Sequence, residues 1–189
     1  MNEPIDIFIL SYLRNNFTKE ALQYIENRTK HPHRIFLLDN GGNAEFKHFV
    51  DYYVGFSQNI GVHAGWNVAL ALATGKYFIM TDNDLLAPDL EPDWLSQMVT
   101  IMDTYPEYAA ISMHPHIFVG AVNIQLDQPE FNEDVIERNM CGAVFRIMRT
   151  DFVRQVGGWE HVIQPGRNNE ERTICSRIQE AGYKVGITP

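Results

Sequence analysis

The sequence predicts a single α/β domain, a three-layer α/β/α sandwich in which helices cover both faces of a mostly parallel β-sheet. Apolar segments typical of strands alternate with segments of helical periodicity along residues 5–113. The chain has 189 residues, which is enough for one domain with a sizeable core and too few for two ordinary domains. In sheets of this kind, ligands bind beyond the carboxyl ends of the strands, so functional residues are expected there.

The first half of the chain contains the regular part of this alternation. Apolar runs predict strands at residues 5–10, 35–38, 52–56, 77–80 and 109–113. Helical spacing of apolar residues predicts helices after the first, third and fourth of these strands. We expect Asn15 or Asn16 to cap the first helix. Gly75 follows the second helix, and Pro92 is expected to open the third.

The second half is less regular. Residues 114–140 have few periodic apolar positions and are interpreted as a long functional loop, which we expect to order over a bound ligand. A strand is expected at residues 141–148, followed by a short helix that Thr150 caps and that ends before Gly157. The last helix is expected at residues 170–181 and the last strand at residues 183–187.

Composition excludes several classes of protein. The chain carries 15 Lys and Arg against 24 Asp and Glu, a formal net charge of −9 without a basic cluster, so a nucleic-acid partner is not expected. Its two cysteines form no CxxC pair, which argues against a zinc site or a disulfide framework. No run of 18 apolar residues and no signal sequence is present. We therefore expect a cytoplasmic protein, bound at most peripherally to a membrane.

The stretch GKYFIMTDNDLLAPD, residues 75–89, places two carboxylates at the end of a buried strand. In an extended chain Asp82 and Asp84 project to the same side, where they repel each other unless a proton or a cation lies between them. Hard carboxylate oxygens suit Mg²⁺ or Mn²⁺, either of which could hold a diphosphate. This route matters because no glycine-rich phosphate loop follows the first strand. The alternative is a surface turn, where Asp is common.

Other candidate residues each have a structural alternative. Asp39 could accept hydrogen bonds from a base or ribose, or it could serve only the tight turn that Asn-Gly-Gly predicts after it. Asn59 and Asn67 flank the start of the second helix, where they could cap it or contact a donor sugar or phosphate. Trp159 could stack on a sugar ring or fill the core. Glu171 could act as a base or only stabilise the start of its helix.

Five blocks occur in the order found in the family 2 glycosyltransferases of the GT-A fold, and the resemblance covers nearly the whole chain. The blocks are IDIFILSYLR, IFLLDNGG, NIGVHAGWNVALALATGKYFIMTDND, CGAVFRIMRTDFVRQVGGWE and EERTICSRIQEAGYKV. The resemblance implies a metal-dependent enzyme that transfers a sugar from a nucleotide diphosphate, preferably UDP, to a hydroxyl with inversion. The acceptor would be a glycan, a lipid-linked molecule or another hydroxyl compound.

The resemblance also implies roles for particular residues. Ser11, Tyr12 and Asp39 would bind the nucleoside. Apart from the resemblance, the position of Asn67 makes it a further expected donor contact. Asp82 would bind the ribose and, together with Asp84, the metal ion, which is Mn²⁺ or Mg²⁺. The acidic pair Glu170-Glu171 would supply the catalytic base at Glu171. Apart from the resemblance, we expect Glu170 and Trp159 near the acceptor.

The chain departs from the family pattern in two places. Thr173 stands where family members often have a further Asp, and the family usually continues past the last strand to a metal-binding His. We expect residues 1–113 to bind the nucleotide sugar and residues 114–189 to form the acceptor and catalytic half. Either the segment with the metal-binding His follows after Pro189, or the protein does without that ligand. Two alternatives follow: a degenerate domain that binds a sugar nucleotide or a partner without turnover, and a nucleotidyltransferase.

Overall fold

The computed structural model describes residues 3–41, 44–114, 133–160 and 170–188. The strands in these ranges are β1 (Ile5–Ser11), β2 (His33–Asp39), β3 (Tyr52–Gly55), β4 (Tyr77–Asp82), β5 (Tyr108–Met113), β6 (Ile136–Arg138), β7 (Arg146–Arg149) and β8 (Lys184–Thr188). The helices are α1 (Asn15–Arg28), the short 3-10 helix η1 (Ala44–Phe46), α2 (Val62–Leu72), α3 (Trp94–Thr104), α4 (Thr150–Gln155) and α5 (Glu170–Glu180).

The described strands form one sheet in the order β3-β2-β1-β4-β7-β5-β8-β6. β3, β2, β1 and β4 run parallel, and β5 and β8 are parallel to each other. β7 is antiparallel to both of its neighbours, β4 and β5, and β6 is antiparallel to β8. The predicted mostly parallel sheet is therefore confirmed, with β7 inserted between two strands that precede it in the chain.

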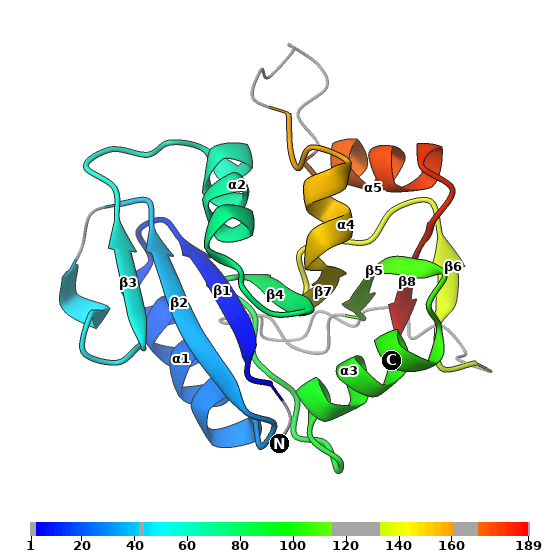
Figure 1. Ribbon diagram of the computed structural model, residues 1–189. Coiled ribbons are helices and arrows are strands. Elements are labelled where there is room, and N and C mark those ends of the chain that lie inside the picture. The colour runs from blue at the N-terminus through cyan, green and yellow to red at the C-terminus, as the bar shows by residue number, and fades with distance from the viewer. Residues whose placement is uncertain (1–2, 42–43, 115–132, 161–169, 189) are drawn as a thin grey trace.

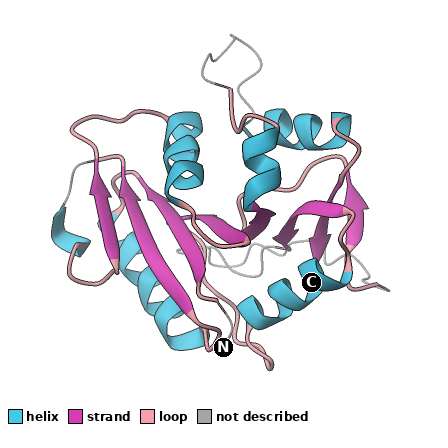
Figure 2. Cartoon of the chain, viewed as in Figure 1, coloured by secondary structure: helices cyan, strands magenta, loops and turns pink. Residues whose placement is uncertain are grey.

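Helices cover both faces of this sheet (Figure 1; Figure 2), and a hydrophobic core lies on each face. Side chains of α1 and α3 pack with Ile7, Ile79 and Ile147 on one face. Side chains of α2, α4 and α5 pack with Phe8 and Met80 and their neighbours on the other face. Successive core residues of β1, β2 and β4 alternate between the two cores, as expected for strands covered on both sides. The three-layer arrangement is thus confirmed.

Several predicted boundaries were wrong. Residues 136–138, expected within a loop, form the edge strand β6, and residues 141–145, expected to be extended, precede the strand β7. One isoleucine followed by two exposed charged residues is too weak an apolar signal to predict a strand, and β6 is instead ordered by its pairing with β8. The central part of the predicted loop, residues 115–132, lies outside the described residues.

The predicted helix caps also need correction. Asn15 and Thr150 begin their helices, and the residues before them, Arg14 and Arg149, make no side-chain cap. Asp93 caps α3, because its carboxylate accepts a hydrogen bond from the Ser96 backbone N–H. Pro92 therefore lies before the helix and does not open it. The Thr150 side chain is buried, and Thr150 is the first residue of α4 rather than its cap.

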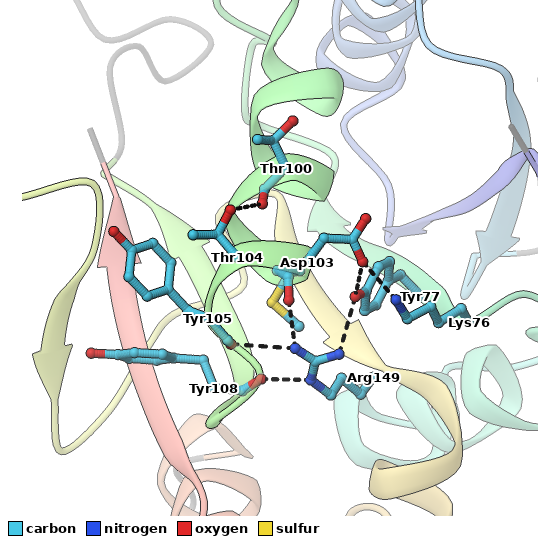
Figure 3. A network of polar contacts seen from close by, with 9 residues as sticks. Lys76, Tyr77, Thr100, Asp103, Thr104, Tyr105, Tyr108 and Arg149 are labelled. Atoms are coloured by element: carbon cyan, nitrogen blue, oxygen red, sulfur yellow. Dashed lines mark hydrogen bonds and ion pairs between the residues drawn. The ribbon is translucent and has the colours of Figure 1, made fainter.

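The amino-terminal edge of the sheet is closed by a polar network around Arg149, the last residue of β7 (Figure 3). Its guanidinium donates to the carbonyl oxygens of Tyr108 at 2.8 Å and Met102 at 2.6 Å, and to the hydroxyl of Tyr77 at 3.0 Å. The Tyr77 hydroxyl in turn donates to Asp103 at 2.7 Å. Arg149 thus ties the carboxyl end of α3 to three strands.

Candidate functional site

Strand register brings the predicted donor-binding residues together at the carboxyl edge of the sheet. Ser11 at the end of β1 is opposite Asp39 at the end of β2. Leu10, one residue earlier on β1, is opposite Asp82 at the end of β4. Three residues far apart in sequence therefore lie at the carboxyl ends of adjacent strands, which is where parallel sheets bind ligands.

Asp39 is buried and held by neutral donors. Its Oδ1 accepts a hydrogen bond from the Gly41 backbone N–H at 2.9 Å, and its Oδ2 accepts one from the Tyr53 hydroxyl at 2.8 Å. Burial and this contact with Asp39 raise the pKa of Tyr53 to about 12. The Gly41 contact is the tight turn that the sequence offers as the alternative. Each carboxylate oxygen keeps a further lone pair for a nucleoside, so that role stays a prediction.

Asn83, the middle residue of the acidic triplet, turns inward and connects the triplet to the β1–α1 turn. Its Nδ2 donates to Thr18 Oγ1 at 2.8 Å and lies 3.3 Å from Ser11 Oγ. The hydroxyls of Ser11 and Thr18 are 2.9 Å apart. This cluster was not predicted from the sequence, although the alternation that puts Asp82 and Asp84 on one side puts Asn83 on the other. The cluster fixes the end of β1 against the end of β4.

Asp84 forms an ion pair in which Arg14 Nη1 lies 3.1 Å from Oδ2. Arg14 and the preceding Leu13 adopt left-handed conformations, with φ of 55° and 56°, which cost energy in residues with a side chain. The pair is largely exposed, so it contributes little stability. Tyr12 is also exposed beside this turn. This exposed turn therefore presents an aromatic ring and a cation next to the acidic triplet.

The donor set fits a hard divalent cation only in part. Asp82 and Asp84 offer carboxylate oxygens, which Mg²⁺ and Mn²⁺ accept. Within the described ranges, no three His, Cys, Asp or Glu side chains form a metal-binding group. An octahedral ion held by two carboxylates keeps positions for water and for phosphate oxygens of a ligand. These residues therefore fit a metal that binds together with a diphosphate better than one bound alone.

Asn67 and Trp159 contact each other across 92 residues of sequence. The Asn67 side chain donates to the Trp159 carbonyl oxygen at 3.0 Å and accepts from the Trp159 N–H at 3.0 Å. The Trp159 ring is fully buried. The buried ring matches the core alternative for Trp159, whereas Asn67 lies inside α2 and does not cap it. Contact of either residue with a sugar stays a prediction. Asn59 accepts from the Gly61 N–H at 2.7 Å, so it forms a turn before α2 whose cap position is Gly61.

Glu171 lies in the first turn of α5, against the segment that leads into β7. Its Oε1 is 3.8 Å from the position that a Cβ on Gly142 would take. β7 begins at Arg146, opposite Met80 of β4, so this segment lies at the same edge of the sheet as Asp82. The side chain of Glu170 lies outside the described part of the chain. Glu171 therefore lies beside the segment that enters the sheet at this edge, and its role as a base stays a prediction.

A hollow of about 470 Å³ lies away from this edge, between α1 and residues 46–51. None of the candidate residues lines it. Phe46 of the short helix η1 forms part of its wall, and no residue of the acidic triplet lines it. None of the described helices is both long enough and apolar enough to cross a lipid bilayer.

The fold and the acidic edge define a GT-A-type α/β domain. Residues 6–163 match the family described as Glycosyl transferase family 2, and the chain belongs to that family. Uncharacterized proteins of Mycobacterium tuberculosis and Mycobacterium bovis are each 27% identical to it over 122 residues, which cover 59% of this chain and 34% of theirs. The chain therefore spans about a third of the length of these relatives.

Solved structures of glycosyltransferases share the fold. TarS of S. aureus, residues 1–349, has a TM-score of 0.74 at 13% identity, with 98% of this chain and 58% of that chain covered. The mannosyltransferase PcManGT from Pyrobaculum calidifontis, in complex with GDP-Man and Mn²⁺, has a TM-score of 0.68 at 15% identity, covering 98% and 54%. GalNAc-T7 with UDP, GalNAc and Mn²⁺ has a TM-score of 0.73 at 12% identity, covering 100% and 43%.

Proposed function

We propose that this protein transfers a sugar from a nucleotide-diphosphate sugar to an acceptor hydroxyl, with a divalent metal ion and with inversion. The observation that carries the proposal is the register that places Ser11, Asp39 and Asp82 on adjacent strand ends, next to Asp84. Membership of the family supports the reaction class. Among structures with this fold, TarS has been solved with UDP and with UDP-GlcNAc, which supports a uridine donor.

Donor binding is assigned to the ends of β1, β2 and β4. Asp39 is oriented by Gly41 and Tyr53, so its remaining lone pairs point in fixed directions toward a nucleoside. Ser11 and the exposed Tyr12 stand beside it, and Asn67 would reach the donor from α2. Asp82 and Asp84 would hold Mn²⁺ or Mg²⁺ with the diphosphate. Such an ion, when bound, neutralises charge that develops on the departing diphosphate.

Proton removal is assigned to Glu171. A hydroxyl is a weak nucleophile at neutral pH, so a carboxylate must lie within hydrogen-bonding reach of it as the donor bond breaks. Glu171 is half-buried at the start of α5, where the helix dipole favours its ionised form. Glu170, the residue before it, is assigned to the acceptor side, and the buried Trp159 ring would have to become exposed to contact an acceptor there. Attack from the side opposite the diphosphate would invert the anomeric carbon.

A second candidate is a domain that binds a sugar nucleotide without turnover. The ion pair between Arg14 and Asp84 favours it, because a protein cation already neutralises one of the two predicted metal ligands. The pair is exposed, however, and exposed pairs are worth only about 0–1 kcal/mol, less than a metal bound to a carboxylate pair and a diphosphate would supply.

Thermal unfolding with UDP, UDP-sugars and GDP-sugars, each with Mn²⁺ or with EDTA, tests the donor site. A ligand at about 100 times its dissociation constant adds about 2.7 kcal/mol of stability, and we expect this only with the metal. Asp84→Asn should abolish the metal dependence. The control Asp89→Asn, at an exposed position on the same segment, should retain it. Equal stabilisation in EDTA, or none with any nucleotide, contradicts the proposal.

A further inference from the structure

Two cysteines that the proposed mechanism does not use lie side by side behind Glu171. The sulfurs of Cys141 and Cys175 are 3.9 Å apart, and both side chains are buried. Cys175 Sγ also lies 3.5 Å from the backbone nitrogen of Cys141 and 3.8 Å from its carbonyl oxygen. Cys175 thus lies against the backbone of Cys141, although 34 residues separate the two in sequence.

A buried cation accompanies the two thiols. Arg146 has no exposed surface, and its Nη1 donates to the carbonyl oxygen of Cys141 at 3.0 Å. Its Nε and Nη2 have no hydrogen-bond partner among the described residues, and its guanidinium carbon is 5.7 Å from the centre of the Trp159 ring. A buried cation is costly unless an anion compensates it. A thiolate beside the guanidinium supplies such compensation.

The two thiols differ in acidity. A hydrogen bond from Cys141, together with the Cys141 backbone and the Arg146 charge, lowers the pKa of Cys175 to about 7, against the opposing effects of burial and of Glu171. The hydrogen bond to Cys175 and burial raise the pKa of Cys141 well above its usual value. The pair therefore has an asymmetric arrangement, in which Cys175 is the nucleophile and Cys141 the thiol that responds second.

We propose that Cys141 and Cys175 form a redox-active dithiol that a small disulfide converts reversibly into an intramolecular disulfide bond. The Cys175 thiolate attacks one sulfur of the small disulfide, whose S–S bond breaks and releases one thiolate. That thiolate takes up the proton of Cys141. The Cys141 thiolate then attacks Cys175 Sγ and releases the second thiolate, which takes up from solvent a proton equivalent to the one that Cys175 lost on ionising. Overall the protein loses two electrons and two protons and the small disulfide gains them.

The geometry permits the second step with little movement. A disulfide has an S–S distance of about 2.05 Å, so the sulfurs must approach by about 1.9 Å. Rotation of a cysteine side chain between rotamers moves its sulfur by more than this. The first step requires a local opening of the segment before β7, because both thiols are buried.

The bond would join the two segments that surround Glu171, and this consequence rests on the proposed function. Cys175 is one helical turn after Glu171 on α5, and Cys141 precedes Gly142, which faces Glu171. Displacement of a reacting group by about 1 Å can lower turnover by about 10²-fold. We expect oxidation to lower transfer by roughly 10- to 100-fold and to leave metal-dependent donor binding at the β1, β2 and β4 edge unchanged.

The experiment treats the full chain with bis(2-hydroxyethyl) disulfide or with a reducing dithiol, and then counts thiols by alkylation and mass spectrometry. The expected product has lost two hydrogen atoms and contains a cross-link between the peptides of Cys141 and Cys175. Cys141→Ser should stop at a mixed disulfide on Cys175. Thiols that stay free in the folded protein, or mixed disulfides on both cysteines of the wild type, overturn the proposal.

Thiol counting needs no turnover, so it separates this proposal from the proposed function. If the disulfide forms while the transfer rate is unchanged, the coupling to Glu171 is wrong. If no transfer occurs with either redox form, the proposed function fails while the dithiol is still tested by its cross-link. Should Cys141→Ser fold poorly, the wild-type cross-link alone decides the outcome.

Discussion

The two edges of the sheet each contain a buried aspartate, and these residues are held in different ways. Asp6 of β1, at the amino-terminal edge, is opposite Arg34 of β2 and accepts from Arg34 Nε at 2.7 Å. Thr74 adds a backbone N–H at 3.0 Å and a hydroxyl at 3.2 Å. Asp39, at the carboxyl edge, accepts only from neutral donors in the described part of the chain, Gly41 and Tyr53.

We infer from this difference that the amino-terminal edge mainly stabilises the fold and that the carboxyl edge is available for the proposed function. At the amino-terminal edge, Asp6 and Arg149 are each held by several protein partners, so their polar groups stabilise the fold. At the carboxyl edge, carboxylates are oriented by neutral groups or by an exposed cation, and they keep capacity for a bound ion or nucleoside. Substitutions at the two edges should therefore affect different measurements.

The largest expected effect is on turnover at the carboxyl edge. Glu171→Gln should lower transfer by roughly 10²- to 10⁴-fold while the fold and metal-dependent donor binding are retained, because only the proton acceptor is lost. Steady-state transfer with a panel of acceptors measures this. The control is Glu180→Gln at the exposed far end of the same helix, which should transfer at the wild-type rate. A loss of about 0.3–1 kcal/mol in stability with normal turnover would show that Glu171 only stabilises its helix.

The next effect is on stability at the amino-terminal edge. Arg149→Met should lower the free energy of unfolding by about 2–3 kcal/mol, because the carbonyl oxygens of Met102 and Tyr108 lose their donor. Chemical denaturation measures this, and nucleotide affinity should not change. Arg138→Met, on the exposed edge strand β6, is the matched control and should stay within about 0.5 kcal/mol of wild type. If Arg149→Met bound the sugar nucleotide more weakly than wild type, the proposed distinction between the two edges would be wrong.

A smaller effect, on both stability and nucleotide binding, is expected from a change beside Asp39. Tyr53→Phe removes its neutral donor, so we expect about 1 kcal/mol of lost stability and weaker nucleotide binding. The pKa of Tyr53 is raised to about 12, so its stabilisation is complete below pH 10 and is lost as pH rises toward 12. The stability difference between wild type and Tyr53→Phe should therefore shrink above pH 10. A constant difference up to pH 12 would mean that the hydroxyl does not hold Asp39.

The smallest effect concerns the cation at the carboxyl edge. Arg14→Gln removes the competitor for Asp84, so the dissociation constant for Mn²⁺ should fall by at most about fivefold, the worth of an exposed ion pair. Calorimetric titration with Mn²⁺ in the absence of nucleotide measures this. Lys19→Gln, which removes an exposed cation elsewhere on α1, should leave the constant unchanged. Weaker Mn²⁺ binding by Arg14→Gln would contradict the competition.

The fold could be predicted from sequence because its strands are continuous apolar runs that need cover on both faces. β1 and β4 are recognisable in the sequence in this way, and the carboxyl end of β4 therefore indicates where Asp82 and Asp84 lie. The position of β7 could not be predicted, because an antiparallel strand between β4 and β5 depends on pairings between residues far apart in the chain, such as Tyr77 with Arg149. Local periodicity does not contain that information.

Contacts within the site were predicted least well where both partners are distant in sequence. Asn83 reaches Thr18 across 65 residues, and Cys141 reaches Cys175 across 34. Neither pair forms a motif. The left-handed turn at Leu13 and Arg14 was also missed, since residues with side chains rarely adopt it and nothing in their chemistry indicates it. Strand ends predict where a site lies, while its internal contacts follow from the folded arrangement.

The place of β7 also constrains how the chain folds. Residues 5–82 contain all of β3, β2, β1 and β4, so this half of the sheet can pair as soon as those residues are available. β7 lies between β4 and β5 but follows both in the chain, and β8 comes last of all. Long loops must close before these strands pair, which makes the second half intrinsically slow to form. Folding should therefore begin at the half that contains Asp39 and Asp82 and finish where α5 and β8 join the sheet.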